Sequence, residues 1–147
     1  MKTVKITPPQ GYTVDKENST FENIVFKLSG NIRDRIQTID DIFTLNNTTE
    51  KEFEKKWKGF SNYEKGNALE ALIVSAYNEG KEPVWGDGSY KYTPYFDMRG
   101  DNFSYYYCVN WNHHCVTSAR FAFLNKENML DAVKKFLKEY KLSRLGK

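Results

Sequence analysis

The sequence predicts an α+β fold in a single domain over residues 1–147, with an antiparallel β-meander packed against two or three helices and a C-terminal amphipathic helix. Three observations predict this fold. Aromatic, strand-like runs fill residues 90–123, two helix-start motifs precede them, and an apolar stripe at helical spacing follows Asn125. At 147 residues, two separate domains would have thin cores.

Residues 2–28 are expected to form an opening β element. Val4 and Ile6 alternate with lysines, and residues 22–28 are rich in strand-forming side chains before Ser29-Gly30 ends the run. In the next segment, residues 31–49, apolar side chains recur at spacings of 4, 3 and 4, which favours a helix that Asn46-Asn47-Thr48 terminates; these side chains are Ile32, Ile36, Ile39 and Phe43.

Two helices are predicted from capping boxes, in which a hydroxyl and a Glu three residues later satisfy the first free amides of a helix. Thr49 with Glu52 begins a short helix, and Ser61 with Glu64 begins a longer one that runs to about Asn78. Gly80 is expected to stop the second helix in a left-handed conformation. Its apolar stripe consists of Ala68, Leu69, Leu72, Ile73, Ala76 and Tyr77.

The predicted strands are residues 90–97, 103–111 and 117–123. Alternation places one set of side chains of the second strand on a common face, where packing against the helices is the favoured interpretation; the set is Phe103, Tyr105, Tyr107, Val109 and Trp111. Asn125 then caps a final helix whose apolar stripe comprises Met129, Leu130, Val133, Phe136, Leu137 and Tyr140.

Composition narrows the function classes. The net charge of +3 is too small to indicate a nucleic-acid partner, although residues 126–147 carry seven basic and three acidic side chains, a local balance of +4. No apolar run reaches the length of a membrane span, so no membrane partner is expected. Two cysteines form no disulfide framework, and a reducing cytoplasm is the expected compartment.

No catalytic or metal site is predicted. The cluster Cys108, His113, His114 and Cys115 has zinc-ligand chemistry, but its spacing is poor and no second ligand pair completes a closed site. Asp87, Asp97 and Asp101 each adjoin a Gly or a turn, where Asp forms local hydrogen bonds, and the tripeptide Arg99-Gly100-Asp101 belongs to such a turn. We therefore expect no cofactor and no enzyme activity.

The aromatic strands also permit a binding hypothesis. Exposed Tyr and Trp rings with neighbouring cations form a platform on which bases stack. The rings of such a platform would be Tyr90, Tyr92, Tyr105, Tyr107 and Trp111, with Lys91 and Arg120 at phosphate. Trp85 lies in a sharp turn before the first strand, where burial as the anchor of the helix–sheet junction is the favoured interpretation and a cleft lined with Tyr90 and Lys91 is the alternative. The candidate ligand-binding residues are Trp85, Tyr90, Lys91, Tyr92 and Arg120.

Three segments of the chain carry the features of a known pattern. The central segment is a helix that ends in Tyr77-Asn78-Glu79-Gly80, followed by the turn Pro83-Val84-Trp85-Gly86-Asp87-Gly88 and a strand that begins with Tyr90-Lys91-Tyr92. The other two segments are the opening Pro9-Gln10-Gly11-Tyr12 with Asp15–Glu22 and the closing Phe121-Ala122-Phe123 with Phe136. Together the three segments resemble a family of small uncharacterised proteins of Bacteroidales phages and mobile elements. Gly86 departs from the family pattern, which has a polar residue after the Trp, and residues 30–60 show no resemblance.

The resemblance implies a phage or prophage accessory protein, located in the cytoplasm of a bacterial host cell or in a virion. It carries over no catalytic residue. The expected function is therefore that of a binding module without catalytic activity, whose partner is an unknown protein or a small nucleotide ligand. One alternative is a nucleotide or single-stranded nucleic-acid binder, for example one that sequesters a host defence signal. The other is a virion structural component. A second copy of the chain is a further candidate partner, which would give a homo-oligomer.

Overall fold

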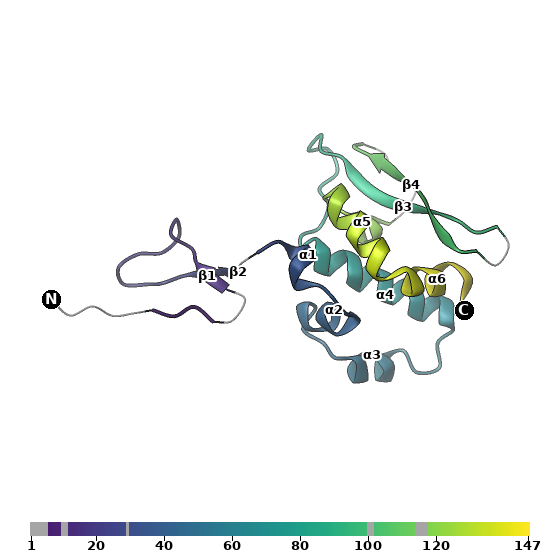
Figure 1. Cartoon of the computed structure of the whole chain (residues 1–147), viewed down its shortest axis with the longest axis horizontal. Helices are drawn as coiled ribbons and strands as arrows, with labels where there is room; N and C mark the ends of the chain where they lie inside the picture. Colours follow the sequence, from purple (N-terminus) through teal and green to yellow (C-terminus); the bar gives the residue numbers. More distant parts are fainter. Residues whose placement is uncertain (1–5, 10–11, 29, 100–101, 114–117) are drawn as a thin grey trace.

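The protein is described by a computed structural model that covers residues 6–9, 12–28, 30–99, 102–113 and 118–147. Six α-helices and two antiparallel two-stranded sheets make up the described part of the chain (Figure 1). The predicted α+β class is confirmed. Helix α4 runs through the body, with α5, α6 and the second sheet on one side of it and the short helices α2 and α3 on the other (Figure 1).

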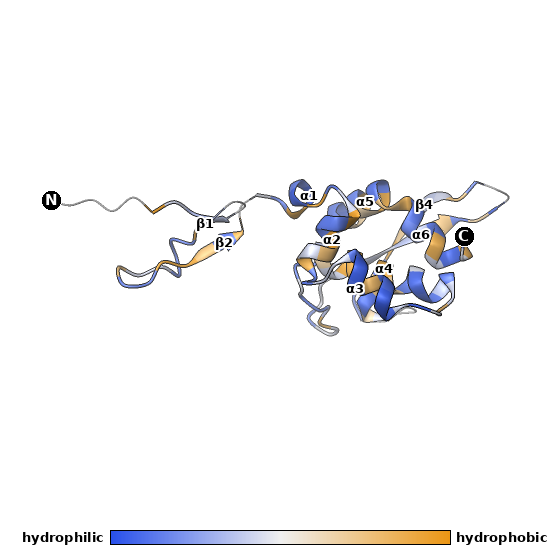
Figure 2. Cartoon of the chain, turned by 90° about the horizontal axis from the view of Figure 1, so that it is seen from below, coloured by the Kyte–Doolittle hydropathy of each residue, from blue (hydrophilic) through white to orange (hydrophobic). Residues whose placement is uncertain are grey.

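The first sheet is a small hairpin that stands apart from the body in two perpendicular views (Figures 1 and 2). Its strands are β1 (Tyr12–Val14) and β2 (Phe26–Leu28), paired with Tyr12 opposite Leu28. Asp15 closes the loop between them by accepting hydrogen bonds from the Asn18 side chain and the Glu17 amide. An opening β element is thus present, but only three residues of the predicted 22–28 run are paired, and Val4 lies outside the described residues.

Residues 31–49 form two short helices, α1 (Ile32–Arg35) and α2 (Ile39–Leu45), where the apolar spacing predicted one. The interruption comes from a capping box at Thr38, whose hydroxyl accepts from the Asp41 amide while the Asp41 carboxylate accepts from the Thr38 amide. Ile36 between the helices is extended but fully buried, so the predicted apolar contacts survive the break.

Both predicted capping boxes are confirmed. Thr49 begins α3 (Glu50–Lys56) and Ser61 begins α4 (Asn62–Tyr77), each with a reciprocal bond to the Glu three residues later. Helix α4 ends one residue earlier than the predicted stop, because Glu79 already takes a left-handed conformation at a φ of 53°. Gly80 follows it and is left-handed as predicted, with a φ of 72° and its N–H donating to the Ser75 carbonyl at 2.9 Å.

The predicted C-terminal helix is divided into α5 (Lys126–Lys135) and α6 (Leu137–Leu145), because Phe136 leaves helical geometry at φ −118° and ψ 32°. Phe136 is nevertheless buried beside Tyr77 of α4. Helices α4 and α6 approach very closely at Gly66, where an added Cβ would lie 2.4 Å from the Ser143 amide nitrogen. The core therefore forms where α4, α5 and α6 meet, and includes Ile73, Val74, Tyr77, Met129, Ala132, Phe136 and Tyr140.

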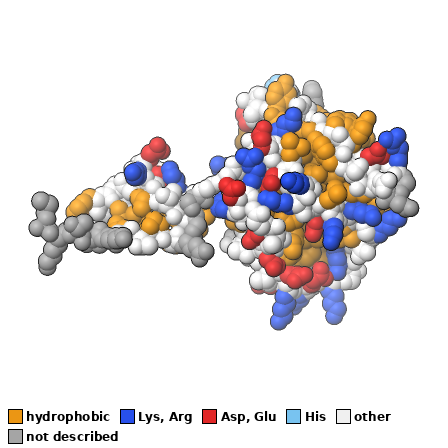
Figure 3. Space-filling model, in the orientation of Figure 1, with side chains coloured by type: hydrophobic (Ala, Val, Ile, Leu, Met, Phe, Trp, Pro, Cys, Tyr) orange, Lys and Arg blue, Asp and Glu red, His pale blue; other side chains and the backbone are white. Residues whose placement is uncertain are grey.

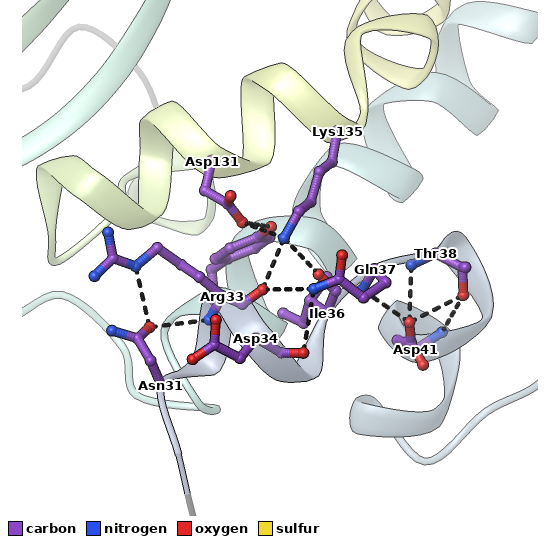
Figure 4. A network of polar contacts seen from close by, with 10 residues as sticks. Asn31, Arg33, Asp34, Ile36, Gln37, Thr38, Asp41, Asp131 and Lys135 are labelled. Carbon is purple, nitrogen blue, oxygen red and sulfur yellow. Dashed lines mark hydrogen bonds and ion pairs between the residues drawn. The ribbon is translucent and has the colours of Figure 1, made fainter.

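A polar network fastens α1 to α5 (Figure 4). The Lys135 ammonium donates to the backbone carbonyls of Arg33 and Ile36 at 2.7 and 2.8 Å, and it also lies 2.8 Å from Asp131. Asp131 in turn accepts a hydrogen bond from the Tyr77 hydroxyl. Carbonyls at the end of a helix lack intrahelical partners, so Lys135 satisfies the end of α1 and attaches it to the core.

The second sheet pairs β3 (Lys91–Asp97) with β4 (Ser104–Trp111). The third predicted strand, 117–123, is not one: its described residues contain a 3₁₀ turn, η1 (Ala119–Phe121), and a single bridge between Phe123 and Tyr92. Phe123 is drawn into the core against Tyr77, with the rings 6.1 Å apart, and the chain turns into α5 two residues later. The structure therefore has a two-stranded hairpin in place of the predicted meander, with a single bridge to Phe123 at the edge of β3 that faces away from β4.

Candidate ligand-binding groove on hairpin β3–β4

A β-bulge interrupts the pairing of β3 with β4. On either side of the bulge, the side chains of β4 alternate between the two faces of the hairpin in opposite phase. Tyr95 of β3 pairs with Tyr107, whereas the next residue, Phe96, pairs with Tyr105, so Tyr106 is the extra residue in β4. An extra residue reverses the alternation of side chains beyond it. Tyr105 consequently packs against the core beside the buried Phe96, and Tyr107 lies on the outer face.

The predicted five-residue stripe of β4 is thus divided. Phe103 and Tyr105 pack against the core, as the favoured interpretation required. Tyr107, Val109 and Trp111 instead line a hollow of about 640 Å³ between the outer face of the hairpin and the segment around η1. We call this hollow the outer groove; its lining residues are Thr93, Pro94, Tyr95, Tyr107, Val109, Trp111, Ser118, Phe121 and Arg144.

Aromatic rings dominate the open side of the outer groove. The ring centroids of Tyr95 and Tyr107 lie 4.9 Å apart, and the two residues are 54% and 45% exposed. Hydrophobic side chains also gather over the upper part of the face shown in Figure 3, which Figure 1 assigns to α5 and the hairpin. Large rings left in contact with solvent in a hollow are typical of ligand sites.

Arg144 of α6 is the one cation among the described residues that line the groove. Its guanidinium binds the carboxylate of Glu70 in α4, with Nη2 2.7 Å from Oε1, and lies 5.6 Å from the centre of the Phe96 ring. Glu70 is fully buried and also accepts from the Ser143 hydroxyl. Burial opposes the charge of Arg144, but the hydrogen bond to Glu70, the negative charge of Glu70 and a contribution from Tyr140 together outweigh it and raise the pKa of Arg144 above its ordinary value.

The structure brings two of the predicted site residues together, Trp85 and Lys91. The Lys91 ammonium lies 5.4 Å from the Trp85 ring centre and donates to Asp87 Oδ1, the Ser89 carbonyl and the Ser89 hydroxyl at 2.5, 3.0 and 2.9 Å. Its three donors are therefore satisfied within the turn, and its side chain is fully buried. Lys91 holds the turn together and has no free donor for a phosphate.

The other predicted residues lie elsewhere. Tyr92 packs against the core on the face opposite Lys91, and Tyr90 is exposed beside the turn. Arg120 lies on η1 with its guanidinium 4.8 Å from the Phe121 ring centre, and it lines two smaller hollows along α4, of about 340 and 590 Å³. Sequence reasoning named Tyr107 and Trp111 as possible stacking rings but missed Tyr95 and Arg144, for which no local motif exists.

The described residues contain no group of three or more His, Cys, Asp or Glu side chains that could hold a metal ion. His114 and Cys115 lie outside the described residues, so the expectation of no metal stays a prediction, and Gly100 and Asp101 of the Arg-Gly-Asp turn also lie outside them. Burial raises the pKa of the Cys108 thiol, which disfavours the thiolate form.

In the part of the chain that the structure describes, no helix has both the length and the apolar character needed to cross a membrane. No protein-family model, no curated protein and no solved structure matches the chain. The resemblance to phage and mobile-element proteins therefore stays a prediction.

Proposed function

We propose that this chain is an accessory binding module of a phage or mobile element, that it acts by binding rather than by catalysis, and that the outer groove is its ligand site. The observation that carries the proposal is the exposed Tyr95–Tyr107 pair inside a hollow of about 640 Å³. Small-ligand sites commonly have volumes of about 300–1,000 Å³ and are lined by aromatic side chains with a few polar groups.

A nucleotide is the ligand class that the groove fits best. Tyr95, Tyr107 and Trp111 offer ring faces on which a base can stack, and Arg144 places one positive charge at the same hollow. A protein that coats a long single strand needs a basic path along the backbone. Among the described lining residues the groove has one cation, already paired with Glu70, so a ligand the size of a nucleotide fits better than a strand.

Such a module would sequester a nucleotide in the bacterial host cell, for example a defence signal. A virion structural role is the second candidate, and the apolar side chains exposed on the separate hairpin β1–β2 favour it, because self-assembly needs apolar surface outside the core.

The test is calorimetric titration of the full chain with a panel of mononucleotides and cyclic dinucleotides. We expect one of them to bind and Tyr107→Ser to weaken that binding about tenfold or more, because stacking contributes about 1–3 kcal/mol per base. Tyr90→Ser is the matched control, since Tyr90 is similarly exposed but does not line the groove.

The proposal fails if no nucleotide binds. It also fails if Tyr90→Ser weakens binding as much as Tyr107→Ser does, because the ligand would then lie at the Trp85–Lys91 turn.

A further inference from the structure

We infer that the N-terminal hairpin of one copy of this protein pairs with the open edge of β4 in a second copy. The inference rests on two features of the same chain, the open edge of β4 and the small hairpin β1–β2. The contact uses the edge of β4, whereas the proposed nucleotide lies on the outer face, so the two hypotheses are tested separately.

The edge of β4 is open and unprotected. β3 covers one side of β4, and within the described ranges no strand covers the other; the outer side of β3, by contrast, carries the bridge to Phe123. The eight residues of β4 contain no charged side chain and no proline. Native edge strands usually carry lysines, prolines or a cover against pairing, and an edge that is protected only by a bulge favours the addition of another strand.

The hairpin β1–β2 is small and exposes apolar side chains, so an added strand would stabilise it. Its strands are three residues long and pack mainly on each other, and a two-stranded hairpin of this kind is marginally stable in water. Phe21 is fully exposed at its tip, and Tyr12 and Leu28 are also exposed. The run that leads into β2 is hydrophobic over Ile24, Val25 and Phe26 (Figure 2). A third strand and an apolar neighbour would stabilise this hairpin.

A second copy is the occupant that fits. The hairpin points away from its own body in both views, so the edge that it can reach belongs to another molecule (Figures 1 and 2). Charge agrees with this pairing: residues 6–28 carry three acidic and two basic side chains, a balance of −1, whereas Lys138 and Lys141 of α6 line a hollow together with Ser104 at the start of β4. Because each copy has one hairpin and one edge, reciprocal exchange closes a two-fold symmetric dimer.

The test is sedimentation velocity of the full chain over a wide range of concentration, with three variants that each replace an exposed apolar side chain by lysine. Phe21→Lys alters the hairpin, Tyr106→Lys places a charge on the β4 edge, and Val84→Lys is the control at an exposed position outside both elements. We expect a concentration-dependent dimer in the wild type and in Val84→Lys, and a dissociation constant raised about tenfold or more in the other two, equivalent to about 1.4 kcal/mol.

Mixing Phe21→Lys with Tyr106→Lys gives the decisive result. The mixture retains one intact hairpin and one intact edge on different molecules, so exchange predicts that a heterodimer forms at protein concentrations at which each variant alone is monomeric. Four results would each overturn the inference. The wild type could be monomeric, or only one of the two variants, measured alone, could show weaker dimerisation. Val84→Lys could weaken dimerisation as much as they do, or the mixture could stay monomeric. Nucleotide titration of Phe21→Lys reports separately on the outer groove, because the substitution lies far from it.

Discussion

Tyr105 and Tyr107 are two residues apart in β4 and lie on opposite faces of the hairpin. In a regular strand they would share a face, but Tyr106 between them is the extra residue of a bulge, and their partners Phe96 and Tyr95 are adjacent in β3. One bulge therefore assigns one tyrosine to the core and the other to the outer groove.

The division predicts unequal effects on stability. Tyr105→Ala should lower the free energy of unfolding by about 2 kcal/mol, because its ring packs against the core, and Tyr107→Ala by less than about 1 kcal/mol, because its ring is exposed. Urea titration of the two variants measures the difference. Equal losses would mean that both rings belong to the core.

The burial of Phe136 at the junction of α5 and α6 predicts a large effect. Phe136→Ala should lower the free energy of unfolding by about 3–5 kcal/mol, since it empties an aromatic site beside Tyr77. Leu130→Ala on α5 is the control, because Leu130 is exposed. A loss of less than about 1 kcal/mol in Phe136→Ala would remove this junction from the core.

Gly66 tests the close approach of α4 and α6. Alanine normally favours a helix over glycine by about 1 kcal/mol, but here its Cβ would lie 2.4 Å from the backbone nitrogen of Ser143. We expect Gly66→Ala to lower the free energy of unfolding by about 3 kcal/mol, as overpacking does. Thermal unfolding compared with Asn67→Ala, one residue along the same helix, measures it. A more stable Gly66→Ala protein would contradict the close crossing.

The turn at residues 85–91 predicts a dependence on pH. The hydrogen bond from Lys91, with those from the Ser89 amide and hydroxyl, lowers the pKa of Asp87 from 3.8 to about 2. A carboxylate whose pKa is lower in the folded state contributes stability above its unfolded pKa and loses it as the pH falls through the folded value. The melting temperature of the wild type should therefore exceed that of Asp87→Asn at neutral pH, and the gap should close between about pH 4 and pH 2. A constant gap across this range would show that the Asp87 carboxylate does not hold Lys91.

Local chemistry predicted several elements correctly. Three local features could be predicted because each involves residues within a few positions of one another: the capping boxes at Thr49 and Ser61 and the left-handed Gly80 after α4. The break at Thr38 was missed because Asp41 takes the place of the usual Glu or Gln, although the hydroxyl-and-carboxylate spacing was present as a signal.

The sequence by itself determined the α+β class, the helix starts and most of the side chains that form the core, since these depend on periodicity and on neighbours along the chain. Only the tertiary structure decided the outer groove. The bulge at Tyr106 depends on how β4 pairs with β3, Arg144 reaches the groove from a helix more than thirty residues away along the chain, and Lys91 is saturated by the fold of its own turn. Strand register and side-chain burial depend on contacts between distant segments, so the alternation of side chains in a single strand does not predict them.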